Sequence, residues 1–178
     1  MRDRYESLKP ASLVASISSM PRRWKEAIRV DPPKNIEDYF TVAGTDGSAA
    51  EQVGAVIAQL KILSNAIRTT SYNVPEPLPP EAAVAVENRG SGPWPETAAD
   101  ALAQLREIFT VLEEQLGALK PHDWNKSANV LTGTTPVDGV PTPSAQSLTV
   151  LQLAQGASRV AADRLPLVER IIRNAAND

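Results

Sequence analysis

Hydrophobic residues recur every three or four positions in four separate stretches of the chain, which is the period of an amphipathic α-helix. The first stretch covers 11–30, the second 48–72, the third 96–119 and the fourth 147–174. In the third stretch, steps of four and three alternate without a break, as they do along the seam of a helical bundle. The pattern predicts four long helices and no convincing strand.

Capping and helix-breaking residues mark several of the predicted helix ends. Ser48 and Glu51 have the spacing of a capping box, which predicts that the second helix begins near Ser48. Pro21 falls within the first helix, so this helix either kinks there or gives way to a second one. Pro166 falls within the fourth helix and predicts a kink.

The connections between the predicted helices are long and rich in turn residues. Residues 74–95 hold six of the fifteen prolines, which predicts an extended crossing with a short turn at 82–87. Asp138-Gly139 is a turn signal that could close a small hairpin before the fourth helix. Together these features predict one domain over 1–178, an all-α four-helix bundle with long crossover loops.

The composition fits a globular all-α domain and argues against some classes of binding partner. The 178 residues are 42% hydrophobic and 22% charged, as in a globular protein with a real core. The net charge of -3 argues against nucleic-acid binding. The densest basic group, Arg22, Arg23 and Lys25, is interpreted as a solvated helix face. There is no cysteine, so disulfides, thiolate nucleophiles and Cys-ligated metals are excluded.

Hydropathy also bears on location. The first ten residues, MRDRYESLKP, are polar and lack the apolar core of a signal peptide. No apolar run approaches the roughly 20 residues needed to span a bilayer. We therefore expect a cytoplasmic protein that has no membrane partner.

Three segments together resemble a known family: SAAEQVGAVIAQLKIL in the second helix, HDWNKSA after the third, and LTVLQLAQGASRVAADRLPLVERII in the fourth. Their order and spacing, with the pair Asp123–Trp124, resemble the DinB-like bundles, which include the actinobacterial mycothiol-dependent maleylpyruvate isomerase N-terminal domains. The resemblance covers nearly the whole chain. It implies a four-helix bundle, and because family members are often dimers, a homodimer is also expected.

The resemblance directs attention to a metal site. Metal-binding members of that family use one histidine from the second helix and two, spaced H-x-x-x-H, from the fourth. The matching residues here are Gln52, Gln155 and Arg159. A shifted register would match Val160 and Arg164 instead. An amide is a poor ligand for zinc or nickel and a guanidinium repels a cation, so we predict that the metal site is lost and that no cofactor is bound.

The polar positions of the fourth helix have several interpretations. If Arg159 faces the interior, Glu51 or Gln52 could pair with it, and this network would replace the metal and hold two helices in register. Alternatively, Arg159, Gln155 and Gln52 line a pocket for a small anionic or amide-bearing ligand, because a guanidinium matches two carboxylate oxygens. A third interpretation places Arg159 in solvent.

The long connections carry aromatic residues and the chain's single histidine. Trp94 and Trp124 either form a lid over such a pocket or cap the ends of the core. His122, beside Trp124, is interpreted as a solvent-exposed or capping residue and not as a metal ligand.

No motif identifies an activity, and three functions stay open. The first is a DinB-like protein without the metal site that binds a small molecule or has a structural role. The alternative is a thiol-dependent, mycothiol-type S-transferase or isomerase that works without a metal and takes its thiol from a cofactor. The third is an oligomeric interaction module, which would require an exposed apolar helix face.

Overall fold

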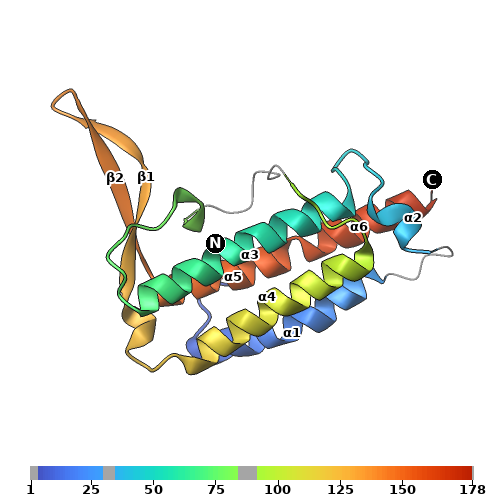
Figure 1. The fold of residues 1–178 in the computed structure, drawn as a ribbon, viewed down its shortest axis with the longest axis horizontal. Helices are drawn as coiled ribbons and strands as arrows, with labels where there is room; N and C mark the ends of the chain where they lie inside the picture. Colours follow the sequence, from blue (N-terminus) through green and yellow to red (C-terminus); the bar gives the residue numbers. More distant parts are fainter. Residues whose placement is uncertain (1–3, 30–34, 84–91, 178) are drawn as a thin grey trace.

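Long helices make up most of the protein (Figure 1). The computed structural model describes residues 4–29, 35–83 and 92–177. The α-helices are α1 (Pro10–Ile28), α2 (Glu37–Phe40), α3 (Ala49–Ser71), α4 (Ala98–Ala118), α5 (Val150–Asp163) and α6 (Leu165–Asn177). The remaining elements are the short 3₁₀ helices η1 (Pro80–Ala82) and η2 (Asp123–Asn125) and the strands β1 (Ser127–Val137) and β2 (Val140–Thr149). The protein is mostly helical, so the predicted all-α class is confirmed only in part.

The long helices α1, α3 and α4 and the consecutive pair α5–α6 lie side by side along the long axis (Figure 1). Helix α1 packs against α4, α5 and α6, and α3 packs against α4 and α5. Helices α3 and α4 run in the same direction, so the end of α3 and the start of α4 lie at opposite ends of the molecule. The core lies between these helices, and its largest fully buried side chains include Trp24, Phe40 and Phe109.

Helix α1 continues through Pro21 as one element, so no second helix begins there. The burial pattern explains why the helix continues: Ile17 and Met20 before Pro21, and Trp24 after it, all lie in the core. The Trp24 Nε1–H donates to the backbone oxygen of Ala161 at 3.0 Å. This bond joins α1 to α5 and satisfies the indole in the interior.

Helix starts are fixed by side chains. At α3 the Ser48 Oγ accepts from the Glu51 amide at 3.1 Å, and the Glu51 carboxylate accepts from the Ser48 amide at 3.1 Å. The predicted capping box is therefore confirmed. At α4 the Glu37 carboxylate accepts from the amides of Ala98 and Ala99 at 2.8 and 3.3 Å, which fastens α2 to the start of α4.

The predicted fourth helix is divided in two. Helix α5 ends at Asp163 and α6 begins at Leu165, with Arg164 between them. Pro166 is the second residue of α6, where its missing N–H costs no helical hydrogen bond. The structure therefore has a break between two helices where the sequence predicted a kink in one helix.

The strands are the main departure from the predicted fold. The expectation of no convincing strand is wrong, because β1 and β2 pair as an antiparallel hairpin that projects away from the helices (Figure 1). The predicted turn is confirmed: Asp138 and Gly139 have φ angles of 51° and 80°, as in a type I′ turn. The strands contain prolines and hydroxyl residues, which obscure the alternation of apolar and polar residues expected of a strand. A two-stranded ribbon tolerates these prolines because both of its strands are edge strands.

The crossing segment packs onto the base of this hairpin. The Leu78 amide donates to the Asn129 oxygen at 2.8 Å, which adds a short bridge beside β1. A 3₁₀ turn at η1 follows immediately, earlier than the turn predicted at 82–87. Residues 84–87 of that prediction lie outside the described residues. None of the helices described is both long and apolar enough to cross a membrane.

Candidate functional site

A polar cluster joins the start of α3 to the junction of α5 and α6. Gln52, buried on α3, accepts a hydrogen bond at its Oε1 from the Arg164 Nη1 at 2.8 Å. Its Nε2 donates to the backbone oxygen of Asp46 at 2.8 Å. The Asp46 carboxylate is paired with Arg170 of α6, also at 2.8 Å. One amide therefore fixes the loop before α3 and the break in the last helix.

This cluster does not suit a metal ion. Gln52 lies against Arg164, the arginine of the shifted register, and Glu51 is engaged in the capping box. A guanidinium bound to the only amide oxygen of Gln52 places a positive charge where a divalent cation would have to bind. Within the described part of the chain, no group of three or more His, Cys, Asp or Glu side chains is arranged to hold a metal.

A separate hollow of about 500 Å³ lies beside α5. Gln152, Gln155, Gly156 and Arg159 all face it because residues three and four apart share a helix face. The other lining residues come from the N-terminal segment, α3, the crossing segment, β2 and α5: Tyr5, Glu6, Leu63, Ala82, Ala83, Gln146, Leu148 and Val160. The hollow thus combines the cationic Arg159 and the acidic Glu6 with several amides and an apolar wall.

Gln155 fastens the N-terminal segment to α5 beside this hollow. Its Nε2 donates to the backbone oxygens of Glu6 and Leu8, each at 3.1 Å. Glu6 lies in the segment before α1. Together with Tyr5 it forms one side of the hollow. Gln155 therefore shapes the opening by holding a second segment in place.

The structure separates the three residues that were predicted to act together, Gln52, Gln155 and Arg159, into two places along α3. Gly156 is beside Leu63, since a Cβ at Gly156 would lie 4.0 Å from the Leu63 Cδ2. Gln52 precedes Leu63 by eleven residues in α3, which corresponds to roughly 16 Å of helix. Gln155 and Arg159 share the hollow, and Gln52 belongs to the cluster with Arg164.

The two loop tryptophans lie at opposite ends of the helices. Trp94 packs on α3 near its start, so closely that a Cβ at Gly54 would overlap the indole ring. Trp124, in η2, is 7% exposed and lies beyond the last turn of α4. Neither residue lines the hollow beside α5. Their placement favours the interpretation that they cap the two ends of the core.

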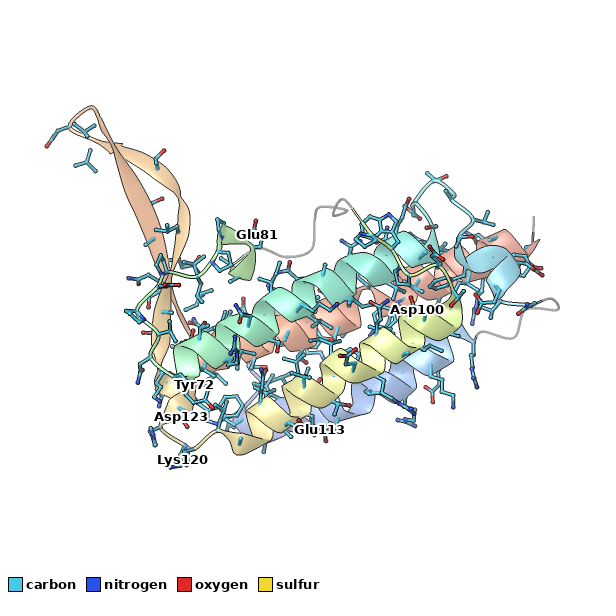
Figure 2. The ribbon with its side chains drawn as sticks, in the orientation of Figure 1. Tyr72, Glu81, Asp100, Glu113, Lys120 and Asp123 are labelled. Carbon is cyan, nitrogen blue, oxygen red and sulfur yellow. The ribbon has the colours of Figure 1, made fainter. Side chains whose placement is uncertain are left out.

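A charged cluster surrounds Asp123 at the end where α3 and α4 finish (Figure 2). The Asp123 carboxylate accepts from the Lys126 ammonium and the Lys120 amide, both at 2.8 Å, and lies 3.3 Å from the His122 Nε2. The hydrogen bond from Lys126, followed by that from the Lys120 amide, lowers the pKa of Asp123. The Lys126 ammonium also donates to the Ser71 oxygen at 2.6 Å, so the cluster ties η2 to the end of α3.

Sequence reasoning missed several residues of these clusters. Asp46 carries no signal of its own, because the GTDG turn before α3 resembles any glycine turn. Gln152 completes a capping box with Thr149, a signal that could have been found from the spacing of those two residues. Gln146 and Leu148 reach the hollow because they lie at the base of the hairpin, where β2 leads directly into α5.

No protein family, curated protein or solved structure matches this chain. The DinB-like assignment therefore stays a prediction from the sequence.

Proposed function

We propose that this protein is a non-catalytic small-molecule-binding protein built on a DinB-like four-helix bundle. In this bundle α5 and α6 together form the fourth helix, and the return connection over 72–97 is one of its long crossovers. The side-by-side packing of α1, α3, α4 and α5–α6 supports this arrangement. The contact between Gln52 and Arg164 is then a structural replacement for the family's metal, because it holds α3 against α5–α6.

The observation that carries the binding function is Arg159 in a hollow of about 500 Å³, a size within the range of roughly 300–1,000 Å³ usual for small-molecule sites. Arg159 would bind a carboxylate through its planar guanidinium. Gln146 and Gln152 offer amide groups that both donate and accept hydrogen bonds. Leu63 and Val160 would contact an apolar portion. The expected ligand is thus a small carboxylate that also carries an amide.

Gly156 supports the same conclusion. It lines the hollow in the middle of α5, where a side chain would project toward Leu63. Glycine in a helix interior costs roughly 0.5–1 kcal/mol relative to alanine. A residue without a side chain at this place keeps the hollow open.

The test is a calorimetric titration with N-acetylleucine, which has a carboxylate, an amide and an apolar side chain. We expect saturable binding by the wild type and weaker binding of the neutral N-acetylleucine amide. Arg159→Gln should raise the Kd roughly ten- to hundredfold, the cost of losing a charge-assisted hydrogen bond. Gly156→Leu should abolish binding by filling the hollow.

Lys61→Gln is the matched control, because Lys61 is exposed on α3, does not line the hollow and changes the net charge equally. It should leave the Kd unchanged. The proposal fails if N-acetylleucine does not bind saturably, or if Arg159→Gln and Lys61→Gln bind it as tightly as each other.

A further inference from the structure

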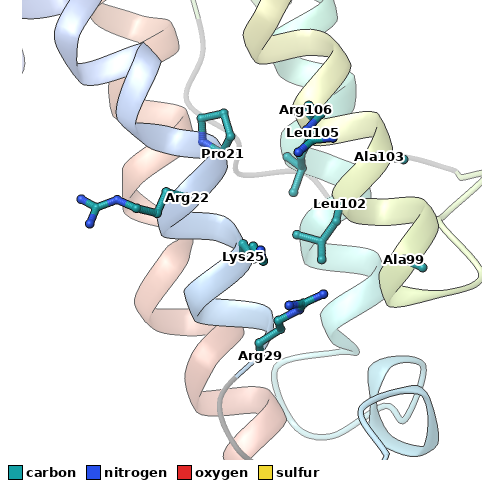
Figure 3. A pocket seen from close by; sticks show the side chains of 9 residues that line it. All are labelled: Pro21, Arg22, Lys25, Arg29, Ala99, Leu102, Ala103, Leu105 and Arg106. Carbon is teal, nitrogen blue, oxygen red and sulfur yellow. The ribbon is translucent and has the colours of Figure 1, made fainter.

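A second groove lies between α1 and α4 (Figure 3). It has a volume of about 560 Å³. Lys25 of α1, Arg29 directly after α1 and Arg106 of α4 border it, with Leu102 and Leu105 between them (Figure 3). Arg22 also borders the groove, but its side chain extends away from α4.

The charge of this groove is of one sign. Its lining includes four basic residues and no acidic one, although the chain as a whole has a net charge of -3. Among the residues described, Arg22 is paired with Glu26, whereas Lys25, Arg29 and Arg106 form no ion pair. Lys25 and Arg29 are four residues apart on one helix face, a spacing at which like charges repel.

Helix electrostatics explain only part of this arrangement. Lys25 and Arg29 lie at the C-terminal end of α1, where cations are favourable. The helix dipole does not favour a cation at Arg106, because this residue lies in the interior of α4, far from the C-terminal end of the helix. The free amides at the start of α4 are already bound by Glu37, so an anion in the groove would be held by side chains.

The floor of the groove is apolar. Leu105 is buried and Leu102 is half-buried, while Ala99 and Ala103 are too small to cover them. Pro21 closes one end with its ring. An apolar strip bordered by cations on both sides matches a molecule with an apolar tail and an anionic head.

We propose that the groove between α1 and α4 binds a small monoanionic amphiphile, with its tail on Leu102 and Leu105 and its head between Arg29, Lys25 and Arg106. This site is distinct from the hollow beside α5. It also gives a use to Lys25, which the sequence pattern attributes to a solvated helix face.

The probe is octanoate, with 1-octanol as the uncharged control, titrated below micelle-forming concentrations into ¹⁵N-labelled protein. Octanoate should shift amide resonances in 22–29 and 99–106 in a saturable way, and octanol should bind more weakly. The double variant Arg29→Gln/Arg106→Gln should weaken binding roughly two- to thirtyfold, as expected for two exposed charge pairs.

The double variant Lys9→Gln/Lys61→Gln makes the same change in net charge with two exposed residues outside the groove. It should bind octanoate like the wild type, and so should Arg159→Gln. The proposal is overturned if octanoate does not saturate, if octanol binds equally well, or if the two double variants weaken binding equally. Loss of octanoate binding in Arg159→Gln would place the site in the hollow and also overturn it. Failure of N-acetylleucine binding alone would leave this result unaffected.

Discussion

Replacing Gly54 with alanine should destabilise the protein, although the same change usually stabilises a helix. Gly54 lies in the interior of α3, where alanine gains about 0.5–1 kcal/mol over glycine. Here the added Cβ would overlap the Trp94 ring and lie 3.2 Å from the Pro95 Cδ. Moving a packed indole costs about 1–3 kcal/mol. The net expectation is a loss of about 1–2 kcal/mol in the free energy of unfolding.

The assay is urea denaturation followed by circular dichroism, with thermal melts in parallel. For a chain of this length the loss corresponds to a fall in Tm of roughly 2–8 °C. Gly117→Ala is the matched control, because no described atom lies within 4 Å of a Cβ at that position of α4. It should leave the stability unchanged or raise it by up to about 1 kcal/mol.

A double-mutant cycle with Trp94→Ala tests the cause. Once the indole is removed, Gly54→Ala should become neutral or stabilising, since only the helix-propensity gain remains. If Gly54→Ala in the native background stabilises the protein as much as Gly117→Ala does, the close packing of Trp94 on α3 is refuted.

Three further changes test other contacts. Gln52→Leu should lower the free energy of unfolding by about 1–3 kcal/mol, because it leaves Arg164 without its amide acceptor; a urea midpoint equal to that of the wild type would contradict this. Ser48→Ala should cost about 1 kcal/mol through loss of the α3 cap in the same measurement, and an unchanged stability would show that the cap contributes nothing. The lowered pKa of Asp123 stabilises the fold above the pKa of an unfolded aspartate, about 4, and this contribution disappears as the pH falls through the folded value. Asp123→Asn should therefore be less stable than the wild type at pH 7 and equally stable near pH 2; a pH-independent difference would count against the ion-pair contribution.

The long helices could be predicted from the sequence because each has a continuous apolar face, whereas the four-residue helix α2 is too short to show one. The capping box at Ser48 and the break near Pro166 were also predictable, since both depend on residues close together in the chain. The hairpin was predictable at its turn but not in its length. Its strands carry Pro136, Pro141 and Pro143, and such residues ordinarily argue against a strand.

The candidate sites were harder to predict because they depend on how distant segments are placed. Periodicity puts Gln155 and Arg159 on one face of α5 but does not say which level of α3 they meet. The structure places Leu63 at that level and Gln52 beside Arg164. Likewise, the cationic groove needs Arg106 of α4 next to α1, a contact that no local pattern encodes.

The claim that the polar contact of Gln52 and Arg164 stands in place of a metal is tested most directly by metal content. Tag-free protein is incubated with zinc or nickel, desalted and analysed by mass spectrometry for bound metal. We predict much less than one ion per chain, and no rise in Tm with added metal, because an ion bound to the native state would stabilise it. One ion per chain in the wild type, lost in Gln52→Leu, would contradict this replacement.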